Sequence, residues 1–517
     1  MKRQTAARLV CAAAVGSLQT VAWVHTAAWP LPVLAIAWLA WQVGRATPRQ
    51  AAALGWVFGC AWFGAGTWWL FISLHRYGQL PAPLAIGAVL LLSSLLALYL
   101  ALAMAWVARQ RSGRPLRDST GFAAAWLAAE LARGVFFTGF PWVATGYSQV
   151  DGPLALLAPW FGVYGIGAWV AWVAAGLVQG VARARSGTGW PRWLVASVAL
   201  TLLAGPAAWS QWRGTPEFTR PGQTLRVALL QTNVAQDEKF AAERLPEALA
   251  WVAVALTSAR AELVLAPETA VPLLPDQLAD LAPGYWAGLQ QHFGRHAADG
   301  GAAALVGVPL GSLRQGYTNS VVGLSAAGSD YRYDKVHLVP FGEFIPTGFR
   351  WFTEMMSIPL GDFNRGSIDP PSFPVRGERI GPNICYEDLF GEELAGRFAD
   401  AASAPSILAN VSNIGWFGDT IAVAQHLQIS RLRSLEFQRP MLRATNTGAT
   451  AVIDHRGVVT AQLAPFTRGV LDATVQGRHG LTPFARWSAA AGLWPLWALA
   501  ALGLTWPRTR WVKPPAR

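Results

Sequence analysis

The sequence is poor in cysteine and in charged residues. Only three of its 517 residues are cysteines, and two of them, Cys11 and Cys60, stand inside apolar runs, whereas Cys385 does not. Three cysteines so placed cannot form a disulfide framework, so cysteine usage assigns no redox compartment. Charged residues make up 14% of the chain and hydrophobic residues 53%. This balance is too apolar for an ordinary soluble protein, and we expect a membrane protein.

Motifs for cofactors are missing as well. No Gly-rich phosphate loop follows an expected strand, and no group of His, Cys and carboxylate residues has the spacing of a metal site. We therefore expect no nucleotide cofactor and no metal, and we interpret His337 and His426 as hydrogen-bonded structural residues rather than ligands. The net charge of +12 lies mostly in short clusters between apolar runs, so nucleic acid is not an expected partner.

Apolar runs of roughly membrane-spanning length, about 17 to 25 residues, occur on both sides of a long polar segment. The first two and the fifth are short or interrupted. The eight runs are Leu9–Val24, Leu31–Val43, Ala52–Leu74, Leu84–Val107, Gly121–Phe137, Leu154–Val178, Trp193–Trp209 and Trp487–Trp506. The first could alternatively be a cleaved signal peptide, but an uncleaved helix suffices because further spans follow at once. The 27 tryptophans suit a chain with many membrane interfaces.

The loop charges indicate an orientation, because short cytoplasmic loops are rich in Lys and Arg. With the N-terminus inside, the short outside loops offer little beyond Arg76 and Arg133. The inside segments carry Lys2, Arg3, Arg8, Arg45, Arg49, Arg109, Arg111, Arg114, Arg117, Arg183, Arg185, Arg192, Arg508, Arg510, Lys513 and Arg517. We therefore expect a seven-span membrane domain over 1–212, a catalytic domain outside the cytoplasm over 213–486, and a C-terminal transmembrane helix with a basic cytoplasmic tail over 487–517.

Glu130 and Arg133 stand three residues apart in the fifth run, a spacing at which two helix side chains share a face. Charges inside a membrane are functional candidates. A structural ion pair near the helix end explains them equally well.

The long segment changes to short strand-like runs that alternate with helical patterns. The expected strands are Leu225–Gln231, Leu263–Ala266, Ala303–Val308, Ser320–Leu324, Arg379–Ile384, Ser406–Val411, Met441–Thr445 and Ala449–Ile453. The expected helices are Glu238–Leu256, Asp276–Gly294, Glu392–Ala399 and Ala422–Glu436. This order is typical of a layered α/β or α+β domain. The aromatic segment Phe341–Gly366 is either a buried core segment or an exposed arm that enters the bilayer or covers a lipid chain.

Cys385 follows an apolar run, where a cysteine is most often a buried small hydrophobe. As a nucleophile it would need a base and a group that stabilises an oxyanion. Glu268, at the end of the strand over Leu263–Ala266, and Lys335, in an alternating segment, are candidates, although each alone could be an ordinary surface residue.

Taken together, three motifs are more specific. Pro267-Glu268, Tyr333-Asp334-Lys335 leading to Pro340-Phe341-Gly342-Glu343, and Ile384-Cys385-Tyr386-Glu387 have the order and approximate spacing of the Glu-Lys-Cys triad of the nitrilase superfamily. The chain resembles that superfamily from about Leu225 to Asp472. The resemblance implies an α-β-β-α sandwich and acyl transfer through a cysteine thioester.

With membrane spans on both sides, the chain resembles the bacterial apolipoprotein N-acyltransferase family over almost its whole length. Local matches agree: Thr138-Gly139-Phe140-Pro141-Trp142, Gly146-Tyr147-Ser148-Gln149, Gln231-Thr232-Asn233-Val234, Asn410-Val411-Ser412-Asn413, Trp416-Phe417-Gly418-Asp419, Gln425-His426-Leu427 and Arg443-Ala444-Thr445-Asn446-Thr447-Gly448. The chain departs from the family at two places. Phe240 replaces a Trp, and Ile414-Gly415 replaces Asp-Ala, which puts any role of that acid in doubt.

The resemblance implies roles for individual residues. Glu268 would be the general base, Cys385 the nucleophile, and Lys335 with the backbone N–H of Tyr386 the oxyanion donors. Glu343 and Glu387 would orient Lys335 and tune the pocket, or else be ordinary ion-pair members. The substrate-binding candidates are Phe240, Phe341, Trp351, Phe352 and Trp416. The expected partners are a phospholipid donor and a diacylglyceryl apolipoprotein acceptor, with the protein a monomer in the bacterial inner membrane and its catalytic domain on the periplasmic side.

Two other functions stay open from the residues alone. A membrane-anchored amidase or nitrilase would use the same thioester with water as acceptor. A transporter or receptor with an enzyme-like outer domain is disfavoured by the complete Glu-Lys-Cys set and by the scarcity of charge in the apolar runs.

Overall fold

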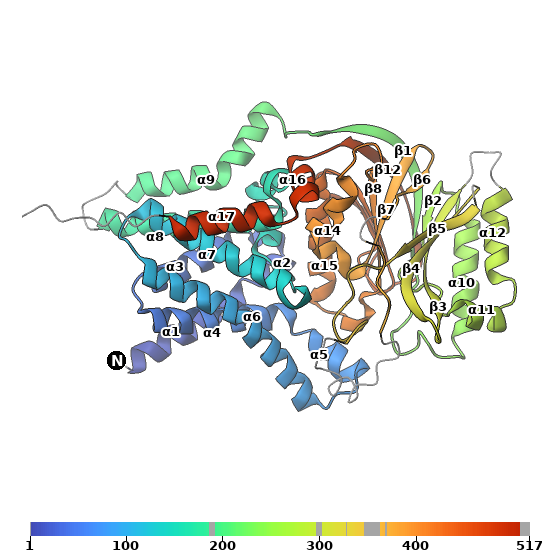
Figure 1. Ribbon diagram of the computed structural model, residues 1–517, viewed down its shortest axis with the longest axis horizontal. Helices are drawn as coiled ribbons and strands as arrows, with labels where there is room; N and C mark the ends of the chain where they lie inside the picture. Colours follow the sequence, from blue (N-terminus) through green and yellow to red (C-terminus); the bar gives the residue numbers. More distant parts are fainter. Residues whose placement is uncertain are drawn as a thin grey trace, which may run out of the picture.

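The computed structural model describes residues 2–185, 192–295, 302–326, 328–345, 362–367 and 370–506. These residues form a bundle of helices joined along one side to two packed β-sheets (Figure 1). Trp351, Phe352 and most of the aromatic segment Phe341–Gly366, expected to be either a buried core segment or an exposed arm, lie outside the described residues.

The bundle consists of long apolar helices with short connections. Its helices are α1 (Lys2–Leu18), α2 (Val21–Val24), α3 (Pro30–Val43), α4 (Pro48–Thr67), α5 (Leu70–Ile72), α6 (Ala82–Gln110), α7 (Pro115–Val135), α8 (Ala158–Arg185) and α9 (Arg192–Arg213). The start of α4 follows from its sequence. Thr47 and Gln50 form a capping box, with the Gln50 N–H donating to Thr47 Oγ1 and the Thr47 N–H donating to Gln50 Oε1.

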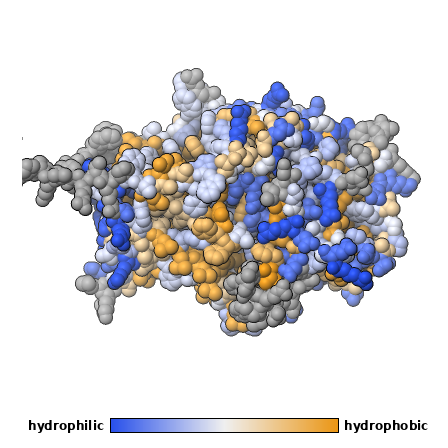
Figure 2. Space-filling view, viewed as in Figure 1, coloured by the Kyte–Doolittle hydropathy of each residue, from blue (hydrophilic) through white to orange (hydrophobic). Residues whose placement is uncertain are grey.

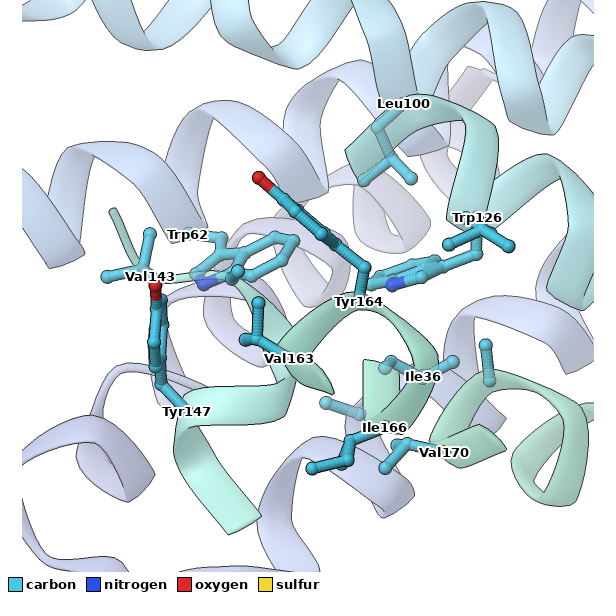
Figure 3. Packing of buried hydrophobic residues seen from close by; sticks show 14 of the residues in the cluster. Ile36, Trp62, Leu100, Trp126, Val143, Tyr147, Val163, Tyr164, Ile166 and Val170 are labelled. Carbon is cyan, nitrogen blue, oxygen red and sulfur yellow. The ribbon is translucent and has the colours of Figure 1, made fainter. Parts of the chain in front are cut away.

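Small residues bring α4 and α6 close together. A Cβ atom at Gly59 would lie 2.9 Å from the Cβ of Ala97, and one at Gly55 would lie 2.9 Å from the carbonyl oxygen of Leu100. Glycines four residues apart are a recurring way for membrane helices to approach each other. Large rings pack between α4 and α7, where Trp62 and Trp126 stack with ring centroids 5.8 Å apart (Figure 3).

Four helical segments of the described chain are long and apolar enough to cross a membrane, and up to six if two bent pairs each count as one span. The four are Gln4–Val24, Thr26–Val43, Ala82–Gln110 and Pro153–Arg185. The bent pairs are Pro48–Thr67 with Leu70–Tyr77, at 63°, and Pro483–Ala491 with Trp494–Thr505, at 89°. The expected count of eight is not confirmed.

The single C-terminal span expected over Trp487–Trp506 is divided in the structure. It consists of α16 (Pro483–Ala491) and α17 (Trp494–Thr505), and Gly492 between them has a φ of +54°. That left-handed conformation favours glycine and ends α16. Because a helix rises about 1.5 Å per residue, the 12 residues of α17 are shorter than the hydrocarbon core of a bilayer.

Two six-stranded sheets pack face to face beside the bundle. One has the order β12-β1-β2-β3-β4-β5 and the other β11-β10-β9-β8-β7-β6. The strands of the first are β1 (Thr219–Gln231), β2 (Leu263–Leu265), β3 (Ala303–Ser312), β4 (Gly316–Ser325), β5 (Gly328–Asp334) and β12 (Gly469–Gly480). The strands of the second are β6 (Phe373–Val375), β7 (Glu378–Ile384), β8 (Ile407–Ser412), β9 (Met441–Thr445), β10 (Ala451–Ile453) and β11 (Val459–Gln462).

Helices cover both outer faces of the sheet pair. The helices α10 (Leu245–Ser258), α11 (Pro275–Leu281) and α12 (Tyr285–Arg295) lie on the first sheet, while α14 (Gly391–Ala395) and α15 (Ile421–Phe437) lie between the second sheet and the bundle (Figure 1). Apolar side chains such as Leu229, Leu265, Ile384 and Val411 fill the space between the sheets. The expected α-β-β-α sandwich is confirmed.

One apolar cluster spans the junction between the bundle and the sandwich. The cluster that contains Tyr147 and Val163 of the bundle continues through Ile429 and Leu432 of α15. Hydrophobic residues dominate the visible surface of the bundle, whereas hydrophilic residues are frequent over the sandwich (Figure 2). The bundle thus has an apolar outer surface and packs against the sandwich through buried apolar side chains.

Some elements differ from those expected. The helical pattern over Asp276–Gly294 is two helices, separated where Gly284 has a φ of +79°. Strand β12 was not expected, although it pairs antiparallel with β1 over most of its length. Most of the β12 residues are exposed or half-buried, so the strand lacks the regular alternation of buried and exposed side chains that marks a strand in a sequence. The proposed domain limits stay predictions.

Candidate active site

Cys385 is positioned by a sharp change of direction at the end of β7. It follows Ile384, the last residue of the strand, and begins a 3-10 turn over Cys385–Leu389. Its φ is +54°, a left-handed value that is uncommon for a residue with a side chain. Such strained positions cluster at functional sites, where the surrounding structure holds them.

The environment of Cys385 favours a neutral thiol at rest. Burial, reinforced by the negative charge of Glu268, raises the pKa of the Cys385 thiol to about 12, although Lys335 acts in the opposite direction. A thiol with so high a pKa carries little thiolate near neutral pH. If the cysteine is the predicted nucleophile, its thiol needs a base to take the proton.

Glu268 and Lys335 are brought together from different strands. Glu268 lies three residues beyond the end of β2, and Lys335 directly follows β5. Lys335 Nζ lies 3.4 Å from Glu268 Oε1 and 2.9 Å from Glu343 Oε1. Lys335 is only 1% exposed. The charges of Glu268 and Lys335 both act on the Cys385 thiol. The three predicted catalytic residues, which follow β2, β5 and β7, therefore lie together where the two sheets face each other.

The buried charges at this site compensate one another. Burial alone would raise the pKa of Glu268, but Lys335 and the Asn319 side chain outweigh it and the pKa is lowered. Burial alone would lower the pKa of Lys335, but Glu343 and Glu268 outweigh it and the pKa is raised. Both groups are therefore kept ionised, which suits a general base beside a cationic oxyanion donor.

Two asparagines complete the setting of Glu268. Asn319 Nδ2 donates to Glu268 Oε1 at 2.7 Å and to Glu343 Oε1 at 2.8 Å. The backbone N–H of Asn413 donates to Glu268 Oε2 at 2.8 Å. Sequence reasoning assigned no role to either residue. The available signals were that Asn413 ends one of the local family matches, Asn410-Val411-Ser412-Asn413, and that it follows an expected strand.

A second buried lysine supports the backbone of Glu268. Lys239 Nζ donates to the carbonyl oxygen of Glu268 at 3.0 Å and to Thr269 Oγ1 at 2.6 Å. Thr269 has a φ of +48°, an outlier for a β-branched residue. Burial lowers the pKa of Lys239 to about 8, against the opposing charges of Glu268 and Cys385. This residue, too, was not predicted.

The two predicted supporting glutamates act at different places. Glu343 contacts the Lys335 ammonium and accepts from the Val339 N–H at 2.8 Å. Glu387 instead accepts from the Tyr333 hydroxyl at 2.6 Å and from backbone N–H groups on both sides of the site. Burial raises the pKa of Glu387 despite these donors. Glu387 thus ties the start of the Cys385 turn to the segment after Lys335.

The described aromatic candidates lie toward the bundle. Phe341 packs against the Leu80 and Ala85 pair, as do Phe71 and Leu74 of the bent helical segment after α4. Trp416 stands edge-on to Tyr77 with ring centroids 5.6 Å apart. Phe240 is half-buried. Whether Trp351 and Phe352 join them lies outside the described residues.

The intramembrane charge pair supports a loop that reaches the site. Arg133 lies 3.9 Å from Glu130 and donates to the carbonyl oxygens of Phe140 and Trp142. Glu130 Oε1 accepts from the Thr145 N–H and hydroxyl, both at 2.8 Å. Both charges are therefore engaged in organising the loop that follows α7.

The predicted histidines both make hydrogen bonds. His337 Nδ1 lies 2.8 Å from Glu393 Oε1, and His426 Nε2 lies 2.9 Å from Asp388 Oδ1. Within the described ranges, no three His, Cys, Asp or Glu side chains are grouped so that they could hold a metal ion.

Sequence comparison assigns the chain to a protein family. Residues 15–176 match the model of the apolipoprotein N-acyltransferase N-terminal domain, and residues 226–483 match that of carbon-nitrogen hydrolases. An apolipoprotein N-acyltransferase of Verminephrobacter eiseniae is 52% identical, with 90% of this chain and 89% of that protein covered. The chain belongs to the apolipoprotein N-acyltransferase family.

Other apolipoprotein N-acyltransferases are similar to this chain over most of its length. One from Ralstonia nicotianae is 46% identical, with 93% of this chain and 90% of that protein covered. Among solved structures, a CN-hydrolase superfamily protein of Xanthomonas campestris is 19% identical, with a TM-score of 0.38, and covers 49% of this chain and 91% of that chain. As a member of the apolipoprotein N-acyltransferase family with several apolar helices, the chain is a membrane enzyme.

Proposed function

We propose that the enzyme transfers an acyl chain from a membrane phospholipid, through a thioester on Cys385, to the N-terminal amine of diacylglyceryl-cysteine apolipoproteins. The observation that carries this proposal is the pairing of an ionised Glu268, held by Lys335 and Asn413, with a thiol whose pKa is raised to about 12. A base, a cation and a nucleophile are the parts that acyl transfer requires.

In the first half-reaction, Glu268 takes the thiol proton of Cys385, and the sulfur attacks an ester carbonyl of the phospholipid. Lys335 and the N–H of Tyr386 stabilise the oxyanion that forms. When the intermediate collapses, the C–O bond to the glycerol oxygen breaks and Glu268 returns the proton to that oxygen. The products are the Cys385 thioester and a lysophospholipid.

In the second half-reaction, the lipoprotein amine attacks the thioester carbonyl, and Glu268 takes the proton that the amine loses. The oxyanion again lies against Lys335 and the Tyr386 N–H. Collapse breaks the C–S bond, and Cys385 recovers its proton from Glu268. The product is an N-acylated lipoprotein, and no redox step or cofactor is needed.

The position of the site beside the bundle supports lipid substrates. Trp416 contacts Tyr77, and Phe341 shares an apolar cluster with Phe71 and Leu74, so an acyl chain that leaves the bilayer beside the helical segment Leu70–Tyr77 would meet aromatic side chains. The charge distribution of the loops supports a periplasmic position for the sandwich, with the bundle in the bacterial inner membrane.

Mass spectrometry of the purified protein tests this function. Incubation with phospholipid alone should add one acyl chain to Cys385, and a diacylated lipopeptide with a free amine should discharge it much faster than water does. Cys385→Ala should show no adduct. Rapid discharge by water would instead favour a hydrolase, and transfer by purified Cys385→Ala would remove Cys385 from the reaction.

A further inference from the structure

The peptide group between Cys385 and Tyr386 is held from its carbonyl side. The carbonyl oxygen of Cys385 accepts from Asn410 Nδ2 at 3.1 Å and lies 3.3 Å from His426 Nε2. A trans peptide group is planar, and its C=O points opposite to the following N–H. Two donors on the Cys385 carbonyl therefore determine the direction of the Tyr386 N–H.

The two hydrogen bonds hold the backbone at a residue with an unfavourable conformation. Cys385 has a φ of +54°, so the chain would relax to a more common conformation if the turn were not held. Within a 3-10 turn the first N–H groups have no partner in the turn, which leaves the Tyr386 N–H available to a substrate. Its direction then depends on the groups that hold the preceding carbonyl.

The proton on His426 can be assigned from its partners. Arg443 NH2 lies 3.1 Å from His426 Nδ1, and a guanidinium only donates, so Nδ1 is the acceptor. In the neutral ring the proton is therefore on Nε2, which faces Asp388 Oδ1 at 2.9 Å and, more distantly, the Cys385 carbonyl oxygen. The ring thus donates toward the peptide group rather than accepting from it.

Buried charges prevent the His426 ring from turning. Arg443 NH1 lies 3.3 Å from Asp388 Oδ2, and Ser430 donates to the same carboxylate. Asp388 and Arg443 are completely buried, and His426 is 1% exposed. Rotating the imidazole would leave a buried ion pair with unmatched groups, which is costly in a protein interior.

Asn410 is oriented in a similar way by the sheet. Strands β7 and β8 are parallel, with Asn383 beside Asn410. Asn410 Nδ2 donates to Asn383 Oδ1 at 2.6 Å as well as to the Cys385 carbonyl oxygen. The Asn410 amide, the second donor to the Cys385 carbonyl oxygen, is therefore held by Asn383, which lies outside the 3-10 turn.

We propose that Asn410 and His426 are positioning residues that aim the Tyr386 N–H at the oxyanion, with Asp388 and Arg443 holding the imidazole. This proposal rests on the function proposed above, because it assumes that Cys385 attacks a carbonyl. Neither residue needs to touch the substrate. Their contribution is to the stability of the tetrahedral intermediate, not to the binding of the lipid.

The test compares His426→Leu, which removes the donor, with His426→Gln, whose amide N–H can replace it. Single-turnover acylation of Cys385 by phospholipid should slow about tenfold to a hundredfold in His426→Leu, less than the 10² to 10³ typical of losing an oxyanion donor itself. The KM for phospholipid should stay unchanged, because the missing interaction belongs to the transition state. His426→Gln should recover most of the rate.

Alkylation by iodoacetamide separates this role from a structural one. Alkylation consumes the same cysteine but forms no oxyanion, so His426→Leu should alkylate at the wild-type rate. A parallel loss of alkylation and acylation, or equal losses in His426→Leu and His426→Gln, would overturn the proposal. His479→Leu is the matched control, since His479 lies near Glu378 at the opposite edge of the sheets and should leave both rates unchanged.

A second acyl donor keeps the two proposals distinguishable. p-Nitrophenyl butyrate also forms a tetrahedral oxyanion on Cys385 but is not a lipid. If phospholipid fails to acylate the wild-type enzyme while the aryl ester shows the His426 dependence, the proposed donor is wrong and the positioning role stands. If the aryl ester acylates His426→Leu at the wild-type rate, the positioning role is wrong.

Discussion

The hydroxyl of Tyr386 donates a hydrogen bond of 3.1 Å to the carbonyl oxygen of Gly139. Gly139 stands in the loop after α7, with a φ of +82°, and a Cβ atom there would lie 1.9 Å from the Gly134 carbonyl oxygen. A second bond runs from the hydroxyl of Tyr147 to the carbonyl oxygen of Leu389 at 3.2 Å. The turn that carries Cys385 is thus fastened to the bundle at both ends.

Tyr386→Phe should destabilise the junction between the sandwich and the bundle. It removes the donor and leaves the Gly139 carbonyl oxygen without that partner, which costs about 1 to 3 kcal/mol of unfolding free energy for a buried group. Thermal unfolding in detergent should show a lower Tm. Tyr147→Phe is the matched variant and should have an effect of the same sign, whereas an unchanged Tm in both would show that the two bonds contribute little.

Glu268→Gln should prevent acylation of Cys385. The amide has nearly the same shape but takes no proton, and the thiol pKa of about 12 leaves almost no thiolate without a base. Because the pKa of Glu268 is lowered, the wild-type acylation rate should fall only at pH values below the ordinary range of a Glu, as the base becomes protonated. Normal single-turnover acylation of the Gln variant would exclude Glu268 as the base.

Lys335→Arg should lose most of the activity although it keeps the charge. The ammonium sits between Glu268 and Glu343 with 1% exposure, which leaves no room for a larger planar guanidinium. A fall of 10² to 10³ in the acylation rate constant is expected from loss of an oxyanion donor. Lys335→Met provides the comparison without charge. Wild-type turnover in the Arg variant would mean that positive charge alone is sufficient.

Lys239→Met should change how stability depends on pH. Burial lowers the pKa of Lys239 to about 8, below its unfolded value of about 10.4. Between these values the unfolded state binds more protons, so this residue makes the wild type gain stability as pH rises from about 8 to 10.4. The gain should be absent from Lys239→Met and from the permanently charged Lys239→Arg. Parallel Tm profiles from pH 7 to 10.5 for all three proteins would contradict the assigned shift.

Much of the layout could be predicted because its causes are local. Glu268 and Cys385 each follow a strand whose apolar character is visible in the chain, and the order and spacing of the motifs around them added Lys335 to the set. The bend between α16 and α17 could not be predicted in the same way. The apolar run continues across it, and only Gly492 marks the break.

The hydrogen-bond partners of the predicted catalytic groups could not be predicted, because they are distant in sequence. Asn413 reaches Glu268 across 145 positions, and Asn319 reaches it across 51. Asn413 stands in a local family match, but nothing in that match indicated Glu268 as its partner, and Asn319 lies in no motif of the sequence analysis. His426 was expected to be a hydrogen-bonded structural residue, but nothing in the sequence indicated that its partners would be Asp388, Arg443 and the carbonyl of Cys385.

The sequence by itself determined the membrane character, most of the alternating strands and helices and the Glu-Lys-Cys order, because hydrophobic periodicity and motif spacing are local properties of the chain. Only the tertiary structure decided the charge states at the site and the direction of the Cys385 peptide group. Both depend on burial and on hydrogen bonds between segments that come together when the two sheets pack. For that reason Lys239, Asn319, Asn410 and Asn413 acquire a role only in the folded protein.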